Sequence, residues 1–265
     1  MLILRLSKET TKNTKNGVPL FMINFLGKCI QNLFTSFKYI KNGNLTFGAA
    51  IEQAASISYD SMSIALTIVF IASTVIALQI SKQFLMSGAE AYVGGFIAVA
   101  MIREIAPGFA ALAIGARAGT AVCAQVANMQ VTDQIDAIKT LKVDPVGYYF
   151  APRILAAAIT VPMVVILAEL IGIIGGLIIA YFTIDLHPYR YLNSVWLLIQ
   201  PKDIYISLFK GVIFGIVIAC VCATQGYLTS GGAADVGVST TKSAIKCTIY
   251  LLVADFIVNL LFYIG

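Results

Sequence analysis

The chain has 265 residues, of which 59% are hydrophobic and only 12% are charged, and its net charge is +5. A soluble domain averages about 25% charged residues, so this composition excludes an ordinary soluble domain. Runs of roughly 20 apolar residues recur along the chain and predict an all-α polytopic membrane protein. The positive charge is concentrated near the N-terminus, which indicates a membrane surface rather than nucleic acid as its partner.

The first 60 residues are predicted to lie outside the hydrocarbon core. Residues 1–20 form a polar basic tail, without the apolar core and small-residue cleavage site of a signal peptide. Residues 21–60 are predicted to be interfacial amphipathic helices, because apolar side chains alternate there with lysines that suit anionic headgroups. Asn42-Gly43-Asn44 separates the first of these helices from a second amphipathic piece at about 47–59.

Residues 61–265 are predicted to be a transmembrane domain. We expect five spans, at about residues 62–80, 91–129, 148–182, 204–228 and 241–264. The second is interrupted by Arg103-Glu104 and Pro107, so we expect a kinked or broken helix there. Five spans place the termini on opposite sides, and the excess of Lys and Arg before the first span and after the second predicts that both segments are cytosolic.

Ionisable residues inside the spans are the first candidates for function. A charge in hydrocarbon costs from about 2.5 kcal/mol upward, so it normally faces protein, water or a partner charge. Arg103, Glu104 and Pro107 therefore predict either an interhelical ion pair that only fixes packing or a polar patch along a substrate path. For Glu169 and Asp255 we expect hydrogen bonds between helices, with a proton relay as the alternative.

Two pairs of glycines share a spacing of four residues, which lets helix backbones approach closely, and an arginine stands inside the first pair. These residues are Gly115, Arg117, Gly119, Gly211 and Gly215. We expect them to pack helices, either within the chain or at a dimer seam. The faces at 108–124 and 211–219 are the candidates for such a seam.

The polar segment at about 130–145 is predicted to hold a short amphipathic helix. Val131, Ile135 and Ile138 share one face of it, Thr132 is the expected N-cap, and Asp144-Pro145 stops its continuation. A short helix between two long spans suits docking to a cytosolic partner, with a merely solvated loop helix as the alternative. The residues proposed for that contact are Thr132, Asp133, Gln134, Asp136, Asp144 and Pro145.

Other kinds of chemistry find no support in the sequence. The chain has no GxxxxGK[ST] phosphate loop, so ATP-driven transport would need an ATPase on another polypeptide. The five cysteines form no CxxC pair, and His187 alone cannot build a metal site. We therefore expect no catalytic residues, metal or cofactor.

The central stretch resembles the MlaE/YrbE family, the permease subunits of lipid-transporting ABC systems, whose plastid branch is the trigalactosyldiacylglycerol type. The family pattern is approximately RE-x-x-P, GR-x-G-(S/T)-A, M-x-(V/A)-T-E-Q-(I/L), (V/M)-DP and PR. The chain has, in the same order, Arg103-Glu104-Ile105-Ala106-Pro107, Ala116-Arg117-Ala118-Gly119-Thr120-Ala121, Met129-Gln130-Val131-Thr132-Asp133-Gln134-Ile135, Val143-Asp144-Pro145 and Pro152-Arg153. The resemblance covers roughly residues 45–264.

Four positions depart from the family pattern. Gln125 replaces a usual glutamate, and Asp133 replaces the longer glutamate of the docking segment. Val238 stands where an arginine is common, and Lys242 replaces a second arginine. The last two departures weaken the expectation that the final cytosolic turn makes the family's standard contacts, and they leave the central block intact.

The resemblance implies a homodimeric permease in a bacterial inner membrane or plastid inner envelope. Its partners would be two cytosolic ABC ATPase subunits and an MCE-type substrate-binding protein, and its substrate a phospholipid or another membrane glycerolipid. Residues 132–136 would dock the ATPase, and Arg103 and Glu104 would lie near the lipid pathway. Two alternatives remain: a proton-coupled carrier that uses Glu104, Glu169 and Asp255, and a membrane scaffold that transports nothing.

Overall fold

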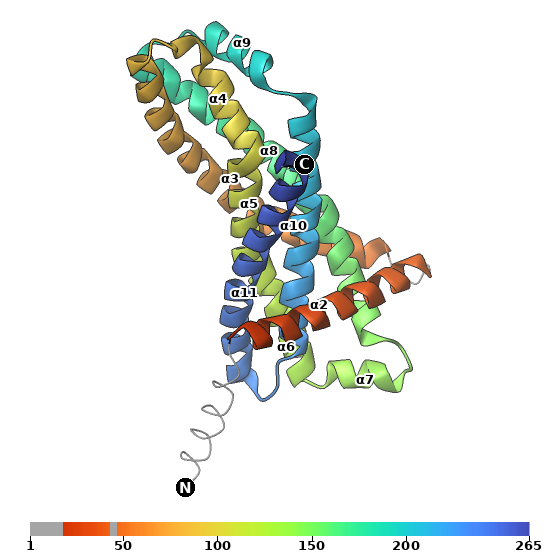
Figure 1. The fold of residues 1–265 in the computed structure, drawn as a ribbon. Helices are drawn as coiled ribbons and strands as arrows, with labels where there is room; N and C mark the ends of the chain where they lie inside the picture. Colours follow the sequence, from red (N-terminus) through yellow and green to blue (C-terminus); the bar gives the residue numbers. More distant parts are fainter. Residues whose placement is uncertain (1–17, 43–46, 265) are drawn as a thin grey trace.

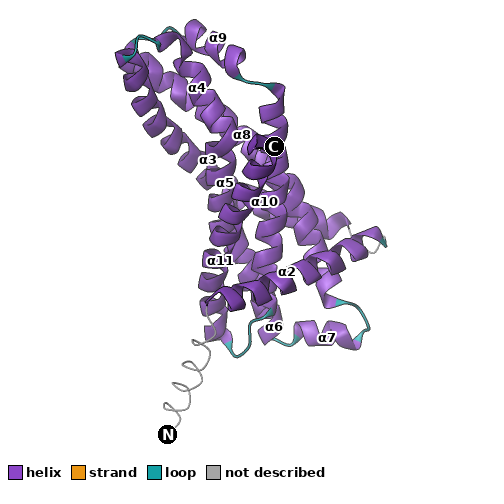
Figure 2. Cartoon of the chain, in the orientation of Figure 1, coloured by secondary structure: helices purple, strands orange, loops and turns teal. Residues whose placement is uncertain are grey.

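The computed structural model describes residues 18–42 and 47–264, and every regular element in these ranges is helical (Figure 2). Among the described residues, five helices are long and apolar enough to cross a membrane: Gly48–Met86, Glu90–Val131, Pro145–Ile184, Pro201–Tyr227 and Ala233–Phe262. The prediction of an all-α membrane protein with five spans is confirmed. All but the last three residues of the predicted basic tail at 1–20 lie outside the described ranges.

The first, third and fourth spans are single α-helices, and the fifth is an α-helix that ends in a π-helical segment. The second span is a succession of α, 3-10 and π segments. The elements are α2 (Val18–Lys41), α3 (Phe47–Met86), η1 (Glu90–Tyr92), α4 (Val93–Ala100), η2 (Met101–Ile105), α5 (Ala106–Ile114), η3 (Gly115–Gly119), α6 (Thr120–Val131), α7 (Gln134–Thr140), α8 (Pro145–Ile184), α9 (Pro188–Leu198), α10 (Pro201–Tyr227), α11 (Ala233–Asn259) and η4 (Leu260–Ile264).

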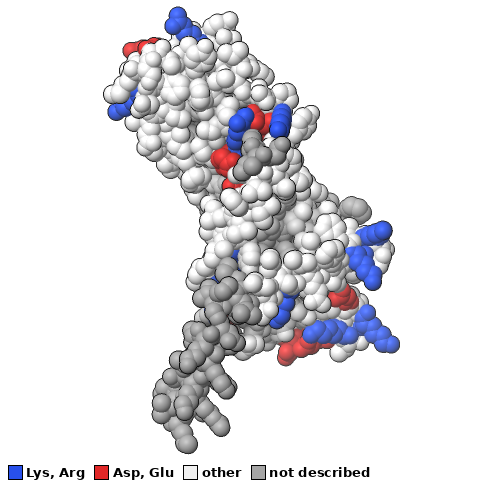
Figure 3. Space-filling view, in the orientation of Figure 1, with Lys and Arg blue, Asp and Glu red and all other residues white. Residues whose placement is uncertain are grey.

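The connections alternate between the two ends of an elongated bundle (Figure 1). One end carries α7 and the turn between α10 and α11, and the other end carries α9 and the turn between α3 and η1. Between the ends most of the visible surface is free of charge, as expected for a face in contact with lipid (Figure 3).

Helix α2 lies across the bundle close to its α7 end and packs against α8 and α10 (Figure 1). Phe25 and Cys29 on its inner face are buried, whereas Ile23, Phe34 and Phe37 are exposed. Exposed large apolar side chains suit a helix embedded at the level of the headgroups. The segment at 47–59, expected as a separate amphipathic piece, is instead the first part of the continuous helix α3.

The second span continues through its polar residues without a break. Two π-helical turns, η2 and η3, carry Arg103 with Glu104 and Arg117 respectively. A π turn inserts an extra residue into an α-helix and re-aims the side chains around it. Pro107 is the second residue of α5, at the N1 or N2 position where a missing N–H is tolerated. The expected interruption therefore takes the form of π turns.

The glycine motifs are used for packing inside the chain. A Cβ atom on Gly215 would lie 2.3 Å from the carbonyl oxygen of Ala157, and one on Gly211 would lie 2.8 Å from the Cα of Pro162, both on α8. On the second span, Gly119 faces Cys222 of α10 and Gly115 faces Cys247 of α11. Gly211 and Gly215 bring the backbones of α10 and α8 into contact, and Gly115 and Gly119 bring η3 close to side chains of α10 and α11. These glycines are therefore not open at a dimer seam.

Candidate functional site

A polar stripe on α10 gathers the charged residues of four elements. Asp203, Ser207 and Lys210 recur at helical spacing, so they share one face of α10, and all three are at most 1% exposed. Each of them meets a polar partner on another element. The remainder of the helix is largely apolar, so these three residues form a distinct polar stripe on it.

Lys210 is the centre of the stripe. Its ammonium nitrogen lies 2.9 Å from a carboxylate oxygen of Glu104 and 2.9 Å from one of Asp255, and it donates to the backbone oxygen of Arg103 at 2.7 Å. The contacts with Glu104 and with the backbone of Arg103 are hydrogen bonds, and the contact with Asp255 is an ion pair, so the buried charge is paired. Lys210 thereby joins the π turn η2 to α10 and α11.

Arg103 forms the second ion pair with α10. Its guanidinium binds Asp203 in a bidentate manner, with N–O distances of 2.8 and 3.1 Å. Asp203 also accepts from the backbone N–H of Gln200 at 3.3 Å, in the first turn of the helix. The helix dipole stabilises a carboxylate near a helix N-terminus. This effect and the hydrogen bond from Gln200 hold Asp203 in position to accept from Arg103.

The cluster formed by Arg103, Glu104, Asp203, Lys210 and Asp255 is exposed at the surface on one side. Asn259 of α11 donates to Glu104 at 3.1 Å, and the side chains of Glu104 and Asp255 are 46% and 26% exposed. Charged atoms gather near the C-terminus on an otherwise uncharged part of the surface (Figure 3). The two cations and three anions of the cluster leave it with one net negative charge.

Glu169 lies beside the same stripe. Its carboxylate on α8 is buried and accepts a hydrogen bond from the hydroxyl of Ser207, one turn of α10 before Lys210. Glu104 and Asp255, which are far apart in sequence, thus meet at Lys210, and Glu169 meets Ser207 one turn earlier on the same helix. Each carboxylate is already engaged by a donor from α10.

Helix α7 forms a short arm at one end of the bundle (Figure 1). Ile135 is fully buried, whereas Asp133, Gln134 and Asp136 are exposed. Asp136 pairs with Lys139 at 2.7 Å, and this hydrogen bond raises the pKa of Lys139. One face thus anchors the arm and the other is open.

The caps around α7 differ from the expectation. Thr132 was the expected N-cap, but it ends α6 and its hydroxyl donates back to the carbonyl oxygen of Asn128 at 2.8 Å. Asp133 precedes α7 with a φ of 59°, a left-handed conformation that Asp and Asn adopt more readily than other non-glycine residues. Asp144 caps α8, accepting from the N–H of Val146 at 3.1 Å.

Two further arginines lie towards the α7 end. Arg117 in η3 is exposed, beside the small residues of its motif. Arg153 is only 4% exposed and donates to the carbonyl oxygen of Tyr149 at 2.7 Å and to the side-chain oxygen of Gln125 at 3.3 Å. The residue at 125, where the resembled family has a glutamate, is therefore a neutral partner of a buried cation.

Sequence reasoning missed Asp203, Lys210 and Asn259. Lys210 is fully buried within α10, inside the predicted fourth span. The available signal was the pair Asp203 and Lys210, seven residues apart at the start of an apolar helix. Among the described residues, no group of three or more His, Cys, Asp or Glu is placed to hold a metal ion.

Comparison with known proteins assigns the chain to a family. The family model described as Permease MlaE matches residues 50–261. A probable ABC transporter permease protein of Synechocystis sp. is 32% identical over 229 residues, covering 86% of this chain and 87% of that protein. One of Rickettsia prowazekii is 30% identical over 236 residues, covering 87% of this chain and 91% of that protein.

A chloroplast protein is among the relatives. Protein TRIGALACTOSYLDIACYLGLYCEROL 1, chloroplastic, of Arabidopsis thaliana is 25% identical over 226 residues, which are 85% of this chain and 65% of that protein. The region that the family model matches, residues 50–261, includes both π turns, the α10 stripe and α7. Bacterial and chloroplast relatives together place the chain among integral proteins of bacterial inner membranes or plastid envelopes. The chain belongs to the MlaE permease family.

Proposed function

We propose that this chain is the membrane subunit of an ABC transporter that moves a phospholipid or another membrane glycerolipid. Its energy comes from ATPase subunits on separate polypeptides. The name of the Arabidopsis relative refers to a glycerolipid, which favours this substrate class. The observation that carries the proposal is the ion network around Lys210, because charges are retained inside a membrane span mainly where function requires them.

The open side of that network suits a lipid headgroup. Glu104 and Arg103 have side chains that are 46% and 35% exposed, whereas their partner Lys210 is fully buried. A headgroup that reaches this side meets fixed charges of both signs, and its acyl chains can lie on the uncharged helix surfaces nearby. Proton-coupled transport is less favoured, because Glu104 and Asp255 share one lysine and Glu169 already binds Ser207.

The arm formed by α7 is the proposed coupling element. Buried Ile135 ties it to the bundle, and its ends continue into the second and third spans through short turns. A force applied to the exposed residues Asp133, Gln134 and Asp136 would therefore act on two spans at once. We place this arm and the N-terminus in the cytosol, as the distribution of Lys and Arg predicts.

A second copy and an MCE-type protein complete the proposed assembly. The glycines of the two motifs already contact other helices of the same chain. The fifth span, which contains α11, is the least buried of the five. Leu252 and Phe256 on α11 and Leu260 at the start of η4 form an exposed apolar row at intervals of four residues. We place the homodimer seam on this row, and the MCE-type protein at the end of the bundle that carries α9.

Two sets of variants separate coupling from lipid handling. Asp133→Asn with Asp136→Lys should release the ATPase while insertion is unchanged, and the asparagine retains a residue type suited to the left-handed conformation. Glu104→Lys should keep the ATPase bound and reduce lipid transfer, with Glu104→Gln as the milder control. The measurements are pull-down of the ATPase, lipid transfer in proteoliposomes, and identification of the co-purified lipid.

The outcomes discriminate between the functional classes. Flux driven by a proton gradient in the protein without ATPase would replace this proposal with a secondary carrier. Normal lipid transfer with an altered Glu104, together with loss of partner recruitment, would favour a scaffold. An Asp133/Asp136 variant that keeps its ATPase and transports normally would refute α7 as the coupling element.

The seam has its own test. All five native cysteines are buried, so a new cysteine at Phe256 can report on the partner copy by cross-linking in membranes. Ile174→Cys on α8, where the native side chain is 55% exposed, is the matched control. Cross-linking at Ile174 but not at Phe256 would move the seam away from α11.

A further inference from the structure

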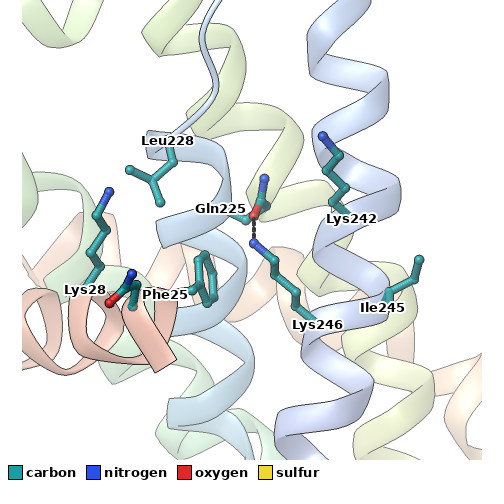
Figure 4. Close-up of a pocket in the computed structure, with 8 residues that line it drawn as sticks. Phe25, Lys28, Gln225, Leu228, Lys242, Ile245 and Lys246 are labelled. Carbon is teal, nitrogen blue, oxygen red and sulfur yellow. Dashed lines mark hydrogen bonds between the residues drawn. The ribbon is translucent and has the colours of Figure 1, made fainter. Parts of the chain in front are cut away.

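A basic pocket lies between α2 and the adjoining ends of α10 and α11 (Figure 4). Its volume is about 530 Å³, and it is remote from the ion network of Lys210. Asp255 follows Lys246 by nine residues on α11, which corresponds to roughly 14 Å along the helix. The lining residues are Asn24, Phe25, Lys28, Gln225, Leu228, Lys242, Ile245 and Lys246.

Three lysines from two elements face this pocket, and none of the described residues that line it is acidic. Lys28 and Lys242 stand on opposite sides, and Lys246 lies between them (Figure 4). Lys246 donates to the side-chain oxygen of Gln225 at 2.6 Å and lies 3.7 Å from the ring centroid of Phe25. These contacts hold one ammonium group in place and leave the pocket positively charged.

An apolar groove continues from the pocket towards the middle of the membrane. Its volume is about 300 Å³, and it runs between the same three helices. It is lined by Leu26, Cys29, Ile30, Leu33, Ile216, Val217, Cys220, Val221, Ile249, Tyr250, Val253, Ala254 and Ile257. Ile249 and Tyr250 follow Ile245 and Lys246 by one helical turn, so on α11 the basic pocket passes directly into the groove.

The order of these features matches one chemical class of ligand. A phosphate with a single negative charge suits three ammonium groups that have no carboxylate among them. An acyl chain suits the adjoining apolar groove, where a soluble anion would leave the apolar surface uncovered. The pocket lies where α2 crosses the bundle, at the level expected for headgroups.

We propose that an anionic glycerophospholipid of the leaflet on the α7 side binds here. Its phosphate lies among Lys28, Lys242 and Lys246, and one acyl chain lies in the groove. The bound lipid joins α2 to α10 and α11 and so fixes the interfacial helix on the bundle. This lipid is a resident of the protein and does not depend on the transport function proposed above.

The test is lipid retention by the purified full-length chain without ATPase or other partners. Native mass spectrometry counts the lipids that remain after titration with phosphatidylglycerol or with phosphatidylcholine. The variant in which Lys28, Lys242 and Lys246 all become glutamine should bind phosphatidylglycerol about 100-fold more weakly, roughly fivefold for each lysine. Its affinity for phosphatidylcholine should be unchanged.

A matched control removes the same charge elsewhere. Lys38, Lys41 and Lys139, which do not line this pocket, are changed to glutamine, and phosphatidylglycerol binding should be within twofold of the original. Val253→Trp fills the groove and should reduce retention of phosphatidylglycerol while all three lysines remain.

Three outcomes overturn the proposal. Equal weakening by the control set would show that only general surface charge matters. Binding of inorganic phosphate as tight as that of phosphatidylglycerol, together with no effect of Val253→Trp, would assign the pocket to a soluble anion. Unchanged retention in the Lys28/Lys242/Lys246 variant would remove the site altogether.

Discussion

Replacement of Lys210 by methionine should destabilise the bundle strongly. The side chain is 0% exposed and bridges Glu104, Asp255 and the backbone oxygen of Arg103. Methionine fills a similar volume, so the change removes the charge and three contacts while packing is largely kept. Two carboxylates that faced one cation would then face each other.

The magnitude follows from the burial of each partner. Loss of one member of a buried ion pair costs about 3–5 kcal/mol. Glu104 is 46% exposed, so solvent screening reduces its part, and the 26% exposed Asp255 supplies more of the effect. We therefore expect the low end, about 3 kcal/mol, which corresponds to a lowering of Tm by roughly 6–12 °C.

Thermal unfolding of the purified protein measures this loss, and a neutral triple variant tests its cause. Lys210→Met with Glu104→Gln and Asp255→Asn removes all three charges, so it should recover at least half of the lost stability. Lipid transfer by the same triple variant separates packing from function, because stability returns while the charged patch does not. A Tm change below about 2 °C for Lys210→Met, or no recovery in the triple variant, would refute the assignment of Lys210 as the centre of the network.

Three further predictions address packing, a buried arginine and a helix cap. Gly215→Val should prevent close contact of α10 with α8 and lower stability by more than about 3 kcal/mol, whereas Gly108→Ala, with nothing within 4 Å of the added Cβ, should be neutral or slightly stabilising in the same unfolding assay. Gln125→Glu should place a charged acceptor 3.3 Å from Arg153 and raise Tm, and an unchanged or lower Tm would argue against this pairing. Asp144→Ala should lose the cap of α8 and cost about 1 kcal/mol, measured against Asp144→Asn, which keeps an acceptor.

The architecture was largely readable from the chain itself. Apolar runs of about 20 residues require helices in a membrane, because every backbone polar group must be satisfied without water. The same local reasoning predicted a short helix within about 130–145, which lies at Gln134–Thr140, whereas Val131 and Thr132 belong to the end of α6. It also predicted the polar interruption at Arg103 and Glu104. The ordered motifs also pointed to the family that the comparisons show.

Partner choice across the bundle was decided only by the tertiary structure. Arg103 and Asp203 are 100 residues apart in sequence, and Glu104 and Lys210 are 106 apart, so no local pattern links them. The same holds for Gly215, whose spacing predicts a close contact but does not say that Ala157 of α8 provides it. Helical periodicity fixes which side chains share a face, whereas the rotation and depth at which helices meet depend on packing of the whole bundle.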